Sequence, residues 1–298
     1  MKPPRLKKGE NIGIIAPAGP VDPSELEQAI GLLESFGHRA ILADQVYNKR
    51  GYLAGDDEAR LGALHGMFED ETIKAILCAR GGYGTLRILD RINVDLIRDH
   101  PKIIVGYSDI TALLLAIYRR TGLITFHGPV VKEFPRNQGK NLRSIFDLVR
   151  GDSLPRFDLT NGEALKQGKG TGMLLGGNLS LISSLVGTPF LPSFKGAILF
   201  LEERDEPLYR IDRMLTHLRL SGVFDGIHGL VAGHFEECGD RNALNELLLD
   251  AVVDQNIPVM TGLPVGHGQE NLTLPLGLAA SLNTEQMALS FSESCVNE

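Results

Sequence analysis

The chain has 298 residues, of which 43% are hydrophobic, so it can bury one large core or two ordinary ones, and we expect two domains. Its formal net charge of −7, without a block of lysine and arginine or a stripe of basic and aromatic residues, excludes nucleic acid as an expected partner. Three scattered cysteines, Cys78, Cys238 and Cys295, argue against a disulfide framework and against a four-ligand zinc site, so we expect reduced thiols.

The N-terminal residues are basic, but the apolar stretch behind them is interrupted by Gly13, Pro17 and Pro20 before the hydrophobic region of a signal peptide develops. No run of residues has the length and apolar character of a membrane-spanning helix. We therefore expect a cytoplasmic protein without a membrane partner.

Hydrophobic periodicity predicts alternating strands and helices over the first 145 residues. The predicted strands are 11–18, 41–43, 73–78 and 102–105, and the predicted helices are 23–36 and 56–68, with one further helix before residue 102 and another after residue 109. Strands that alternate with helices indicate a parallel sheet covered by helices. We therefore predict an N-terminal α/β domain over residues 1–145.

The periodicity fades over residues 146–170, where Gly, Pro, Asp and Lys become frequent, and this stretch is predicted to be a linker. Residues 171–298 are predicted to form a mixed, β-rich α/β domain. Its predicted strands are 196–201, 229–232 and 258–261, its predicted helices are 179–185, 209–218 and 242–254, and a C-terminal hairpin is predicted to turn at 283–285. The fold class is thus α/β with two lobes, and we expect the active site between them.

Ser108 lies where an apolar strand gives way to a helix, in the segment Lys-Ile-Ile-Val-Gly-Tyr-Ser-Asp-Ile-Thr at 102–111. In such an elbow the serine side chain stands clear of the sheet, and the helix N-terminus behind it offers N–H groups to a developing oxyanion. The pattern G-x-S-x-G is only half matched, because Ile110 occupies the position of the second glycine. A serine followed by Asp109 at a helix start is also typical of an N-cap. The predicted nucleophile therefore needs partners elsewhere in the chain.

Two later segments offer a carboxylate and an imidazole, which orient and deprotonate a serine nucleophile. In 196–207 an apolar strand is predicted to end at Glu202, at a sheet edge where clefts form. In 257–268 a second apolar strand leads into a Gly-Pro turn that ends in His267 between two glycines, which leaves the imidazole sterically open. The predicted order is Ser108 as nucleophile, Glu202 as acid and His267 as base.

Glu203 competes with Glu202 for that role. Neighbouring residues on a strand point to opposite faces, so only one of the two carboxylates can meet His267. Asp205 and Glu206, which follow, are predicted to be solvated loop charges.

The turn Arg-Gly-Gly-Tyr-Gly at 80–84 is a second candidate for site chemistry. Adjacent glycines let backbone N–H groups approach a ligand, so Gly82 is predicted to supply one oxyanion donor and the Asp109 N–H the other. The glycines do not follow the G-x-G-x-x-G spacing, and the chain has no Walker G-K-[ST], so a nucleotide site is not expected. The turn is alternatively a tight structural turn.

Three residues are predicted to contact substrate: Arg80, Gly81 and Asn178. The planar guanidinium of Arg80 matches a carboxylate in two-point geometry, although a structural ion pair fits equally. Asn178 opens a predicted helix whose N-terminus can bind an anion or peptide group, although helix capping is the equal alternative.

A metal site is not expected. The local group His234, Glu236, Glu237 and Cys238 lies in a predicted loop without a convincing distant ligand, whereas catalytic zinc needs three protein ligands on rigid elements. This group is predicted to be a polar surface turn. His127 is predicted to end a strand near the cleft.

Taken together, these segments resemble the LD-carboxypeptidase family, serine peptidases that are related to the microcin C immunity peptidases. The resemblance covers nearly the whole chain and rests on six motifs, which are Ile-Ala-Pro-Ala-Gly-Pro (15–20), Ala-Arg-Gly-Gly-Tyr-Gly (79–84), Gly-Tyr-Ser-Asp-Ile-Thr (106–111), Gly-Gly-Asn-Leu-Ser (176–180), Leu-Glu-Glu (201–203) and Gly-His-Gly (266–268). The family alignment favours Glu202 as the acid. Glu203 departs mildly from the family, in which the next position is commonly aspartate.

The resemblance implies a muramoyltetrapeptide carboxypeptidase, which removes the C-terminal D-alanine from murein-derived tetrapeptides through a Ser-His-Glu triad and an acyl-enzyme. It implies no metal or cofactor, a role in cell-wall peptide recycling in the cytoplasm, and a homodimer. Two alternatives stay open. The immunity branch cleaves aminoacyl nucleotides and needs an aromatic platform, to which this chain contributes no tryptophan. The second alternative is a protein with the same fold that binds peptides without catalysis.

Overall fold

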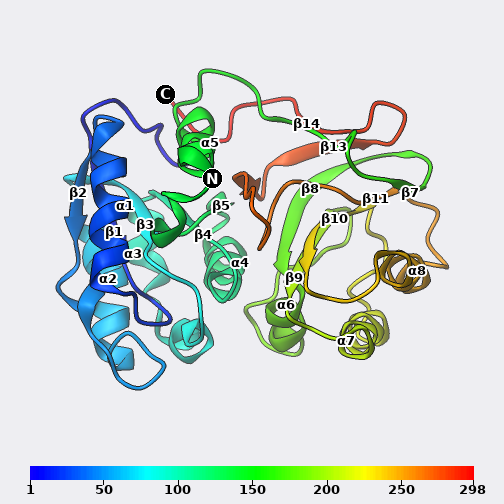
Figure 1. Cartoon of the computed structure of the whole chain (residues 1–298), viewed down its shortest axis with the longest axis horizontal. Coiled ribbons are helices and arrows are strands. Elements are labelled where there is room, and N and C mark those ends of the chain that lie inside the picture. The colour runs from blue at the N-terminus through cyan, green and yellow to red at the C-terminus, as the bar shows by residue number, and fades with distance from the viewer.

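The first lobe is built on a six-stranded sheet, in a computed structural model that describes all residues, 1–298 (Figure 1). Five strands run parallel in the order β5-β4-β3-β1-β2, and β12 lies antiparallel beside β5. The bounds are β1 (Asn11–Ile15), β2 (Arg39–Leu42), β3 (Ile73–Cys78), β4 (Ile103–Gly106), β5 (Thr125–His127) and β12 (Leu274–Leu276).

Helices cover both faces of this sheet because successive strand residues point to opposite sides. Ile14 belongs to the same buried cluster as residues of α1 and α5, whereas its neighbour Ile15 belongs to the cluster that contains residues of α2, α3 and α4. The helices are α1 (Pro23–Ser35), α2 (Asp57–Glu69), α3 (Val94–Asp99), α4 (Ile110–Thr121) and α5 (Lys140–Val149), and the short 3-10 helices are η1 (Asp44–Tyr47), η2 (Thr85–Arg91), η3 (Val131–Glu133) and η4 (Arg136–Gly139).

The second lobe contains an eight-stranded mixed sheet in the order β6-β14-β13-β8-β9-β10-β11-β7. Its four central strands, β8 to β11, are parallel, and antiparallel strands flank them on both sides. The strands are β6 (Arg156–Asp158), β7 (Ala164–Lys166), β8 (Lys169–Asn178), β9 (Ile198–Arg204), β10 (Gly229–Glu236), β11 (Val259–Met260), β13 (Ala279–Asn283) and β14 (Ala288–Phe291), and the helices are α6 (Leu179–Leu185), α7 (Leu208–Leu220) and α8 (Arg241–Ala251). The predicted two-lobed α/β fold with a β-rich second lobe is confirmed.

The lobes lie side by side, and α4 of the first contacts α6 and β8 of the second (Figure 1). At this contact the Asn178 N–H donates to Thr111 Oγ1 at 3.2 Å, and a Cβ on Gly177 would lie only 2.5 Å from Thr111 Cγ2. One continuous cluster of buried apolar residues includes side chains of both lobes, such as Leu115 and Leu199. None of the helices combines the length and apolar character that a membrane span requires.

Two features differ from the sequence-based expectation. The predicted linker, 146–170, contains β6, β7 and the start of β8, which join the second sheet. The strands β6 and β7 form the two edges of that sheet, and alternation such as exposed Arg156, buried Phe157 and exposed Asp158 is too short to detect. The strand β12 was missed because Pro275 lies within it, and proline is tolerated in a strand only at such an edge.

Candidate active site

The elbow at Ser108 has the geometry that the sequence predicts. Strand β4 ends at Gly106 and α4 begins at Ile110, and Ser108 between them has a left-handed φ of 63°. Asp109, not Ser108, occupies the N-cap position, and the Ser108 hydroxyl has no hydrogen-bond partner in the protein. The serine is therefore not a capping residue, and its unusual backbone conformation is typical of functional sites.

Asp109 ties the elbow to the glycine-rich turn. The residue is buried, its Oδ2 accepts a hydrogen bond from the Thr85 N–H at 2.9 Å, and its carbonyl accepts one from Thr85 Oγ1 at 2.6 Å. Burial raises the pKa of the Asp109 carboxyl, against the opposing effect of these bonds. The side chain thus positions the turn, while the Asp109 N–H donates to no protein acceptor.

The glycine-rich turn lies directly against Ser108. A Cβ on Gly81 would be 3.0 Å from Ser108 Cβ and 3.2 Å from Ser108 Oγ. The Gly81 carbonyl accepts a hydrogen bond from Gly19 N–H at 3.0 Å, which holds the turn from the other side. Gly82 has a φ of 110°, and its N–H, like that of Asp109, has no partner within the protein. The close approach of the turn to Ser108 therefore requires glycine at position 81.

Glu202, which is buried, and His267, which is partly exposed to the cavity, form a pair in the second lobe. Glu202 Oε2 lies 2.7 Å from His267 Nδ1, and the ring of His267 packs against Tyr107 with centroids 4.8 Å apart. The predicted end of the strand at Glu202 is wrong, because β9 continues to Arg204 and buries Glu202 completely. A Cβ on Gly266, whose φ is 110°, would lie 2.7 Å from Glu202 Oε2, so glycine lets the His267 loop reach the carboxylate.

The two groups shift one another's pKa. Burial alone would raise the pKa of the Glu202 carboxyl, but the charge and hydrogen bond of His267 hold it below its ordinary value. Burial would likewise lower the pKa of the His267 imidazole, but the Glu202 charge outweighs it and raises that pKa. The pair therefore favours an ionised Glu202 carboxylate, which orients the imidazole through Nδ1. The other ring nitrogen, Nε2, has no hydrogen-bond partner and is free to exchange a proton.

Glu203 points the other way and has a structural task. Its carboxylate accepts hydrogen bonds from the Ser180 N–H at 2.8 Å, Ser180 Oγ at 2.6 Å and Asn178 Nδ2 at 2.8 Å. Asn178 itself is the N-cap of α6 and accepts from the Leu181 N–H at 3.2 Å. Asn178, predicted to contact substrate, is thus buried in a capping network and does not line the cavity described next.

A cavity of about 320 Å³ brings most of the predicted residues together. Arg80, Gly81, Gly82 and Ser108 of the first lobe line it, as does His267 of the second. No hydrogen bond joins Ser108 to His267 in this structure. Such bonds are often long before substrate binds. Arg204 and Asp205 also line the cavity, so Asp205 is not only the solvated loop charge that was predicted.

A further group of residues on the cavity wall was not predicted from the sequence. Tyr107 OH donates to Glu133 Oε1 at 2.6 Å, and Arg136 Nη1 lies 3.1 Å from the same oxygen. Lys132 precedes Glu133 in η3 and also lines the cavity. A single 3-10 turn has no periodicity that would reveal it, so only the Thr-Phe-His-Gly-Pro segment just upstream signalled this region.

His127 ends β5, as predicted, and is completely buried. Neither ring nitrogen has a hydrogen-bond partner, and burial lowers the pKa of the imidazole to about 4. The ring packs edge-on against Phe200 and Tyr107, with centroids 5.0 and 5.8 Å away. His127 therefore stays neutral at physiological pH.

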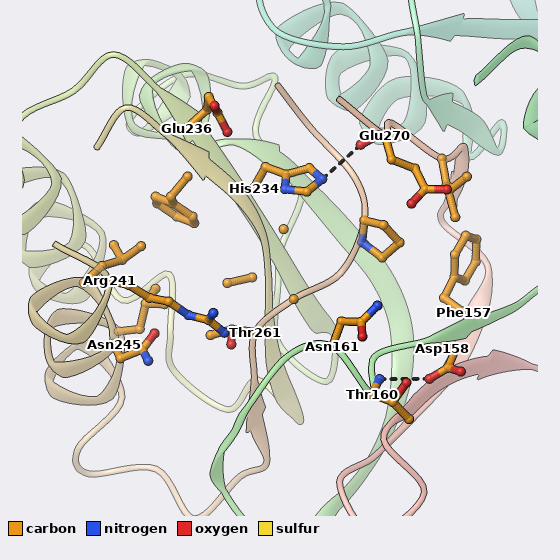
Figure 2. Close-up of a pocket in the computed structure, with 18 of the residues that line it drawn as sticks. Phe157, Asp158, Thr160, Asn161, His234, Glu236, Arg241, Asn245, Thr261 and Glu270 are labelled. Atoms are coloured by element: carbon orange, nitrogen blue, oxygen red, sulfur yellow. Dashed lines mark hydrogen bonds between the residues drawn. The ribbon is translucent and has the colours of Figure 1, made fainter. Parts of the chain in front are cut away.

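A larger cavity of about 600 Å³ lies at the ends of β10 and β11 and beside α8 (Figure 2). It shares no lining residue with the Ser108 cavity. His234 and Glu236 line it, and His234 Nε2 lies 2.9 Å from the Glu270 carbonyl, which belongs to the loop that carries His267. No three His, Cys, Asp or Glu side chains converge as metal ligands anywhere in the chain.

Comparison with known proteins gives a consistent result. The model of the LD-carboxypeptidase N-terminal domain matches residues 12–128, and that of the LD-carboxypeptidase C-terminal domain matches residues 171–282. The "Probable murein peptide carboxypeptidase" of Bacillus subtilis is 40% identical over 96% of this chain and 92% of its own. The murein tetrapeptide carboxypeptidase of Pseudomonas aeruginosa is 31% identical over 93% of this chain and 94% of its own.

Among solved structures, the immunity protein MccF in complex with glutamyl sulfamoyl guanosine superimposes with a TM-score of 0.92 at 25% identity and covers 99% of both chains. The sequence thus matches proteins that are named for murein peptides, whereas the fold also matches a protein that was solved with glutamyl sulfamoyl guanosine.

Proposed function

The chain belongs to the LD-carboxypeptidase family, and from this membership we propose that it removes the C-terminal D-alanine from murein-derived tetrapeptides. As a member it is a serine carboxypeptidase, a hydrolase. The names of the Bacillus and Pseudomonas relatives support murein peptide as the substrate. The task would be recycling of cell-wall peptides, and the homodimer and cytoplasmic location implied by the resemblance are part of the same proposal.

One observation carries the proposal. A strained serine, Ser108, lines the same cavity as His267, whose Nδ1 is held 2.7 Å from the buried Glu202 carboxylate. This arrangement supplies a nucleophile, a base whose free Nε2 can take a proton, and an acid that fixes the base's tautomer.

In the proposed reaction His267 Nε2 accepts the Ser108 proton while Ser108 Oγ attacks the carbonyl carbon between the L-configured centre and D-alanine. The N–H groups of Gly82 and Asp109, which have no partner within the protein, are proposed to donate to the oxyanion. His267 returns the proton to the departing amine of D-alanine. Water then hydrolyses the ester on Ser108, with His267 again as base.

Mass spectrometry of L-Ala-γ-D-Glu-meso-diaminopimelate-D-Ala tests the proposal. We expect the wild-type protein to release one alanine, and Ser108→Ala to lower the rate by roughly 10⁴-fold or more because the nucleophile is lost. Ser35→Ala, which changes an exposed serine at the end of α1, is the matched control and should keep full activity. Equal release by wild type and Ser108→Ala would exclude Ser108 as the nucleophile.

A second candidate function is hydrolysis of aminoacyl nucleotides. It is favoured by the likeness to MccF and by an exposed pair of tyrosines, Tyr52 and Tyr83, whose ring centroids lie 5.4 Å apart beside the glycine-rich turn. Such rings can stack on a base in a chain that has no tryptophan. Cleavage of glutamyl adenylate without cleavage of the tetrapeptide would favour this function over the first.

A further inference from the structure

The Ser108 cavity contains more positive than negative side chains. The charged residues that line it are Arg80, Lys132, Arg136, Arg204, Glu133 and Asp205. Two of the four cations are already neutralised. Arg136 pairs with Glu133 at 3.1 Å, and Arg204 pairs with Asp205 at 3.1 Å.

The other two cations, Arg80 and Lys132, make no ion pair. Arg80 has one hydrogen bond, from Nη1 to the Pro20 carbonyl at 2.7 Å, and the Lys132 ammonium has none. Lys132 is half-buried, and its pKa is lowered by burial and then by the charge of Arg80. Glu133 and Glu25 attract Lys132 only from beyond ion-pair distance. The cavity therefore contains two neighbouring positive charges without a partner.

The backbone brings these cations together on the nucleophile's side of the cavity. The Lys132 N–H donates to the Ala79 carbonyl at 3.2 Å, so η3 is fastened to the end of β3 just before Arg80. Arg80 leads directly into Gly81, where a Cβ would lie 3.0 Å from Ser108 Cβ. Arg80 and Lys132 thus lie on segments next to Ser108, and both residues line the same cavity as Ser108.

We propose that Arg80 and Lys132 together bind the free terminal carboxylate of the residue that leaves, an inference that rests on the proposed peptidase function. Two like charges in a partly buried cavity repel each other, and an anion between them relieves the repulsion and gains charge-assisted hydrogen bonds. A planar guanidinium and a mobile ammonium suit a carboxylate. In an internal peptide bond this position holds a neutral amide, so the pair restricts cleavage to the last residue.

The first test compares kcat/KM for the tetrapeptide that ends in D-alanine with that for the same peptide ending in D-alaninamide. We expect the wild type to prefer the acid by roughly 10- to 100-fold, the usual worth of hydrogen bonds to a charged group. Lys132→Met and Arg80→Gln should lose most of this preference by slowing cleavage of the acid, and Lys132→Arg should retain it. Amidation of a side-chain carboxylate of the peptide, with the terminal carboxylate left free, should not lower kcat/KM in the same way.

Two controls separate this effect from a general loss of charge. Arg136→Gln removes a cation that is already paired, so it should keep the preference for the acid over the amide. Lys140→Met removes an exposed lysine at the start of α5 and should change neither rate. A wild type that cleaves both peptides alike, or variants of Arg80 and Lys132 that keep the preference, would overturn the proposal while leaving the peptidase function intact.

A binding measurement separates the two proposals. Titration of the wild type with N-acetyl-D-alanine, followed by NMR, should show binding that N-acetyl-D-alaninamide does not reproduce and that Lys132→Met loses. If no peptide is cleaved but this acid-specific binding appears, the carboxylate site stands and the peptidase function fails. If the acid and the amide bind alike, the carboxylate site is wrong.

Discussion

Ser108 combines two properties that rarely occur together in one residue. Its left-handed backbone costs a non-glycine residue about 1–2 kcal/mol, and its hydroxyl is not used in any hydrogen bond that would repay the cost. The strain persists because Asp109, the next residue, is anchored to Thr85 through both its side chain and its carbonyl. The structural N-cap interpretation of Ser108 is thereby replaced by one in which the chain presents the hydroxyl to the cavity.

The proposed role of His267 as the base predicts how hydrolysis depends on pH. A base must be neutral, so kcat/KM should fall as the pH drops through the pKa of His267, and Glu202 raises that pKa above the ordinary value of about 6.5. In Glu202→Gln the negative charge is gone, so the pKa of His267 falls and the acid limb moves to lower pH. The maximal rate should also fall by roughly 10⁴-fold as the tautomer is lost.

The measurement is a profile of kcat/KM between pH 5 and 9 (roughly the range in which histidine titrates) for the wild type and Glu202→Gln. Glu133→Gln removes a more distant negative charge, so its limb should move in the same direction by less. An acid limb that stays in place in Glu202→Gln would mean that another group sets the pKa of the base.

At the scale of elements, the site depends on loops, strands and a helix that approach one another closely at glycines. Gly81 lies against Ser108, Gly177 against Thr111 of the other lobe, and Gly266 against Glu202. In each place a Cβ would come within about 3 Å of another group, so these glycines serve close approach as well as turn formation. The glycines around His267 were expected to leave the imidazole open, and the structure adds that Gly266 admits the loop to the carboxylate.

Gly266→Ala should therefore impair catalysis more than stability. Its Cβ would lie 2.7 Å from Glu202 Oε2 and displace the His267 loop, and a displacement of about 1 Å can cost 10²-fold in rate. Kinetics together with urea unfolding would measure both effects. Gly187→Ala is the matched control, because Gly187 has a φ of 82° but nothing within 4 Å of the added Cβ. It should lose comparable stability of about 1 kcal/mol and keep its activity. Equal rates for both variants would contradict the role given to Gly266.

At the scale of the whole molecule, the two lobes depend on each other. The strand β12, from the C-terminal half, completes the edge of the N-terminal sheet beside β5. Helix α4 is buried along most of its length because it lies between elements of its own lobe, such as α3 and β5, and α6 and β8 of the other. The cavity is lined by both lobes, which explains how residues as distant as Ser108 and His267 meet.

We therefore expect that the proposed N-terminal domain, residues 1–145, does not fold by itself. Without β12 and the second lobe, the fragment would expose the apolar surface of α4 that both lobes normally bury. Urea denaturation followed by circular dichroism should show a cooperative transition for the full chain and none for the fragment. A cooperative transition in residues 1–145 alone would show that the first lobe is an independent folding unit.

Much of the architecture was predictable because it is local. The helix 179–185 and the strand 73–78 were found with their observed bounds, since apolar periodicity and neighbouring Gly or Asn mark them. The hairpin turn near residue 284 was found for the same reason. The short edge strands β6, β7 and β12 were missed, because three residues are too few to show a period and owe their extended shape to the strand beside them.

The amino-acid sequence was sufficient for the α/β class, the elbow and the family, since each follows from the order of neighbouring residues. The family resemblance favoured Glu202 over Glu203, whereas the residue pattern alone left both open. The structure supplies the physical reason, because β9 extends further than its apolar run and alternation sends the two carboxylates to opposite faces. The proximity of Arg80 and Lys132 likewise arises from a contact between segments that are some fifty residues apart in the sequence. Local patterns decide secondary structure, whereas ionic partners are decided by packing across the chain.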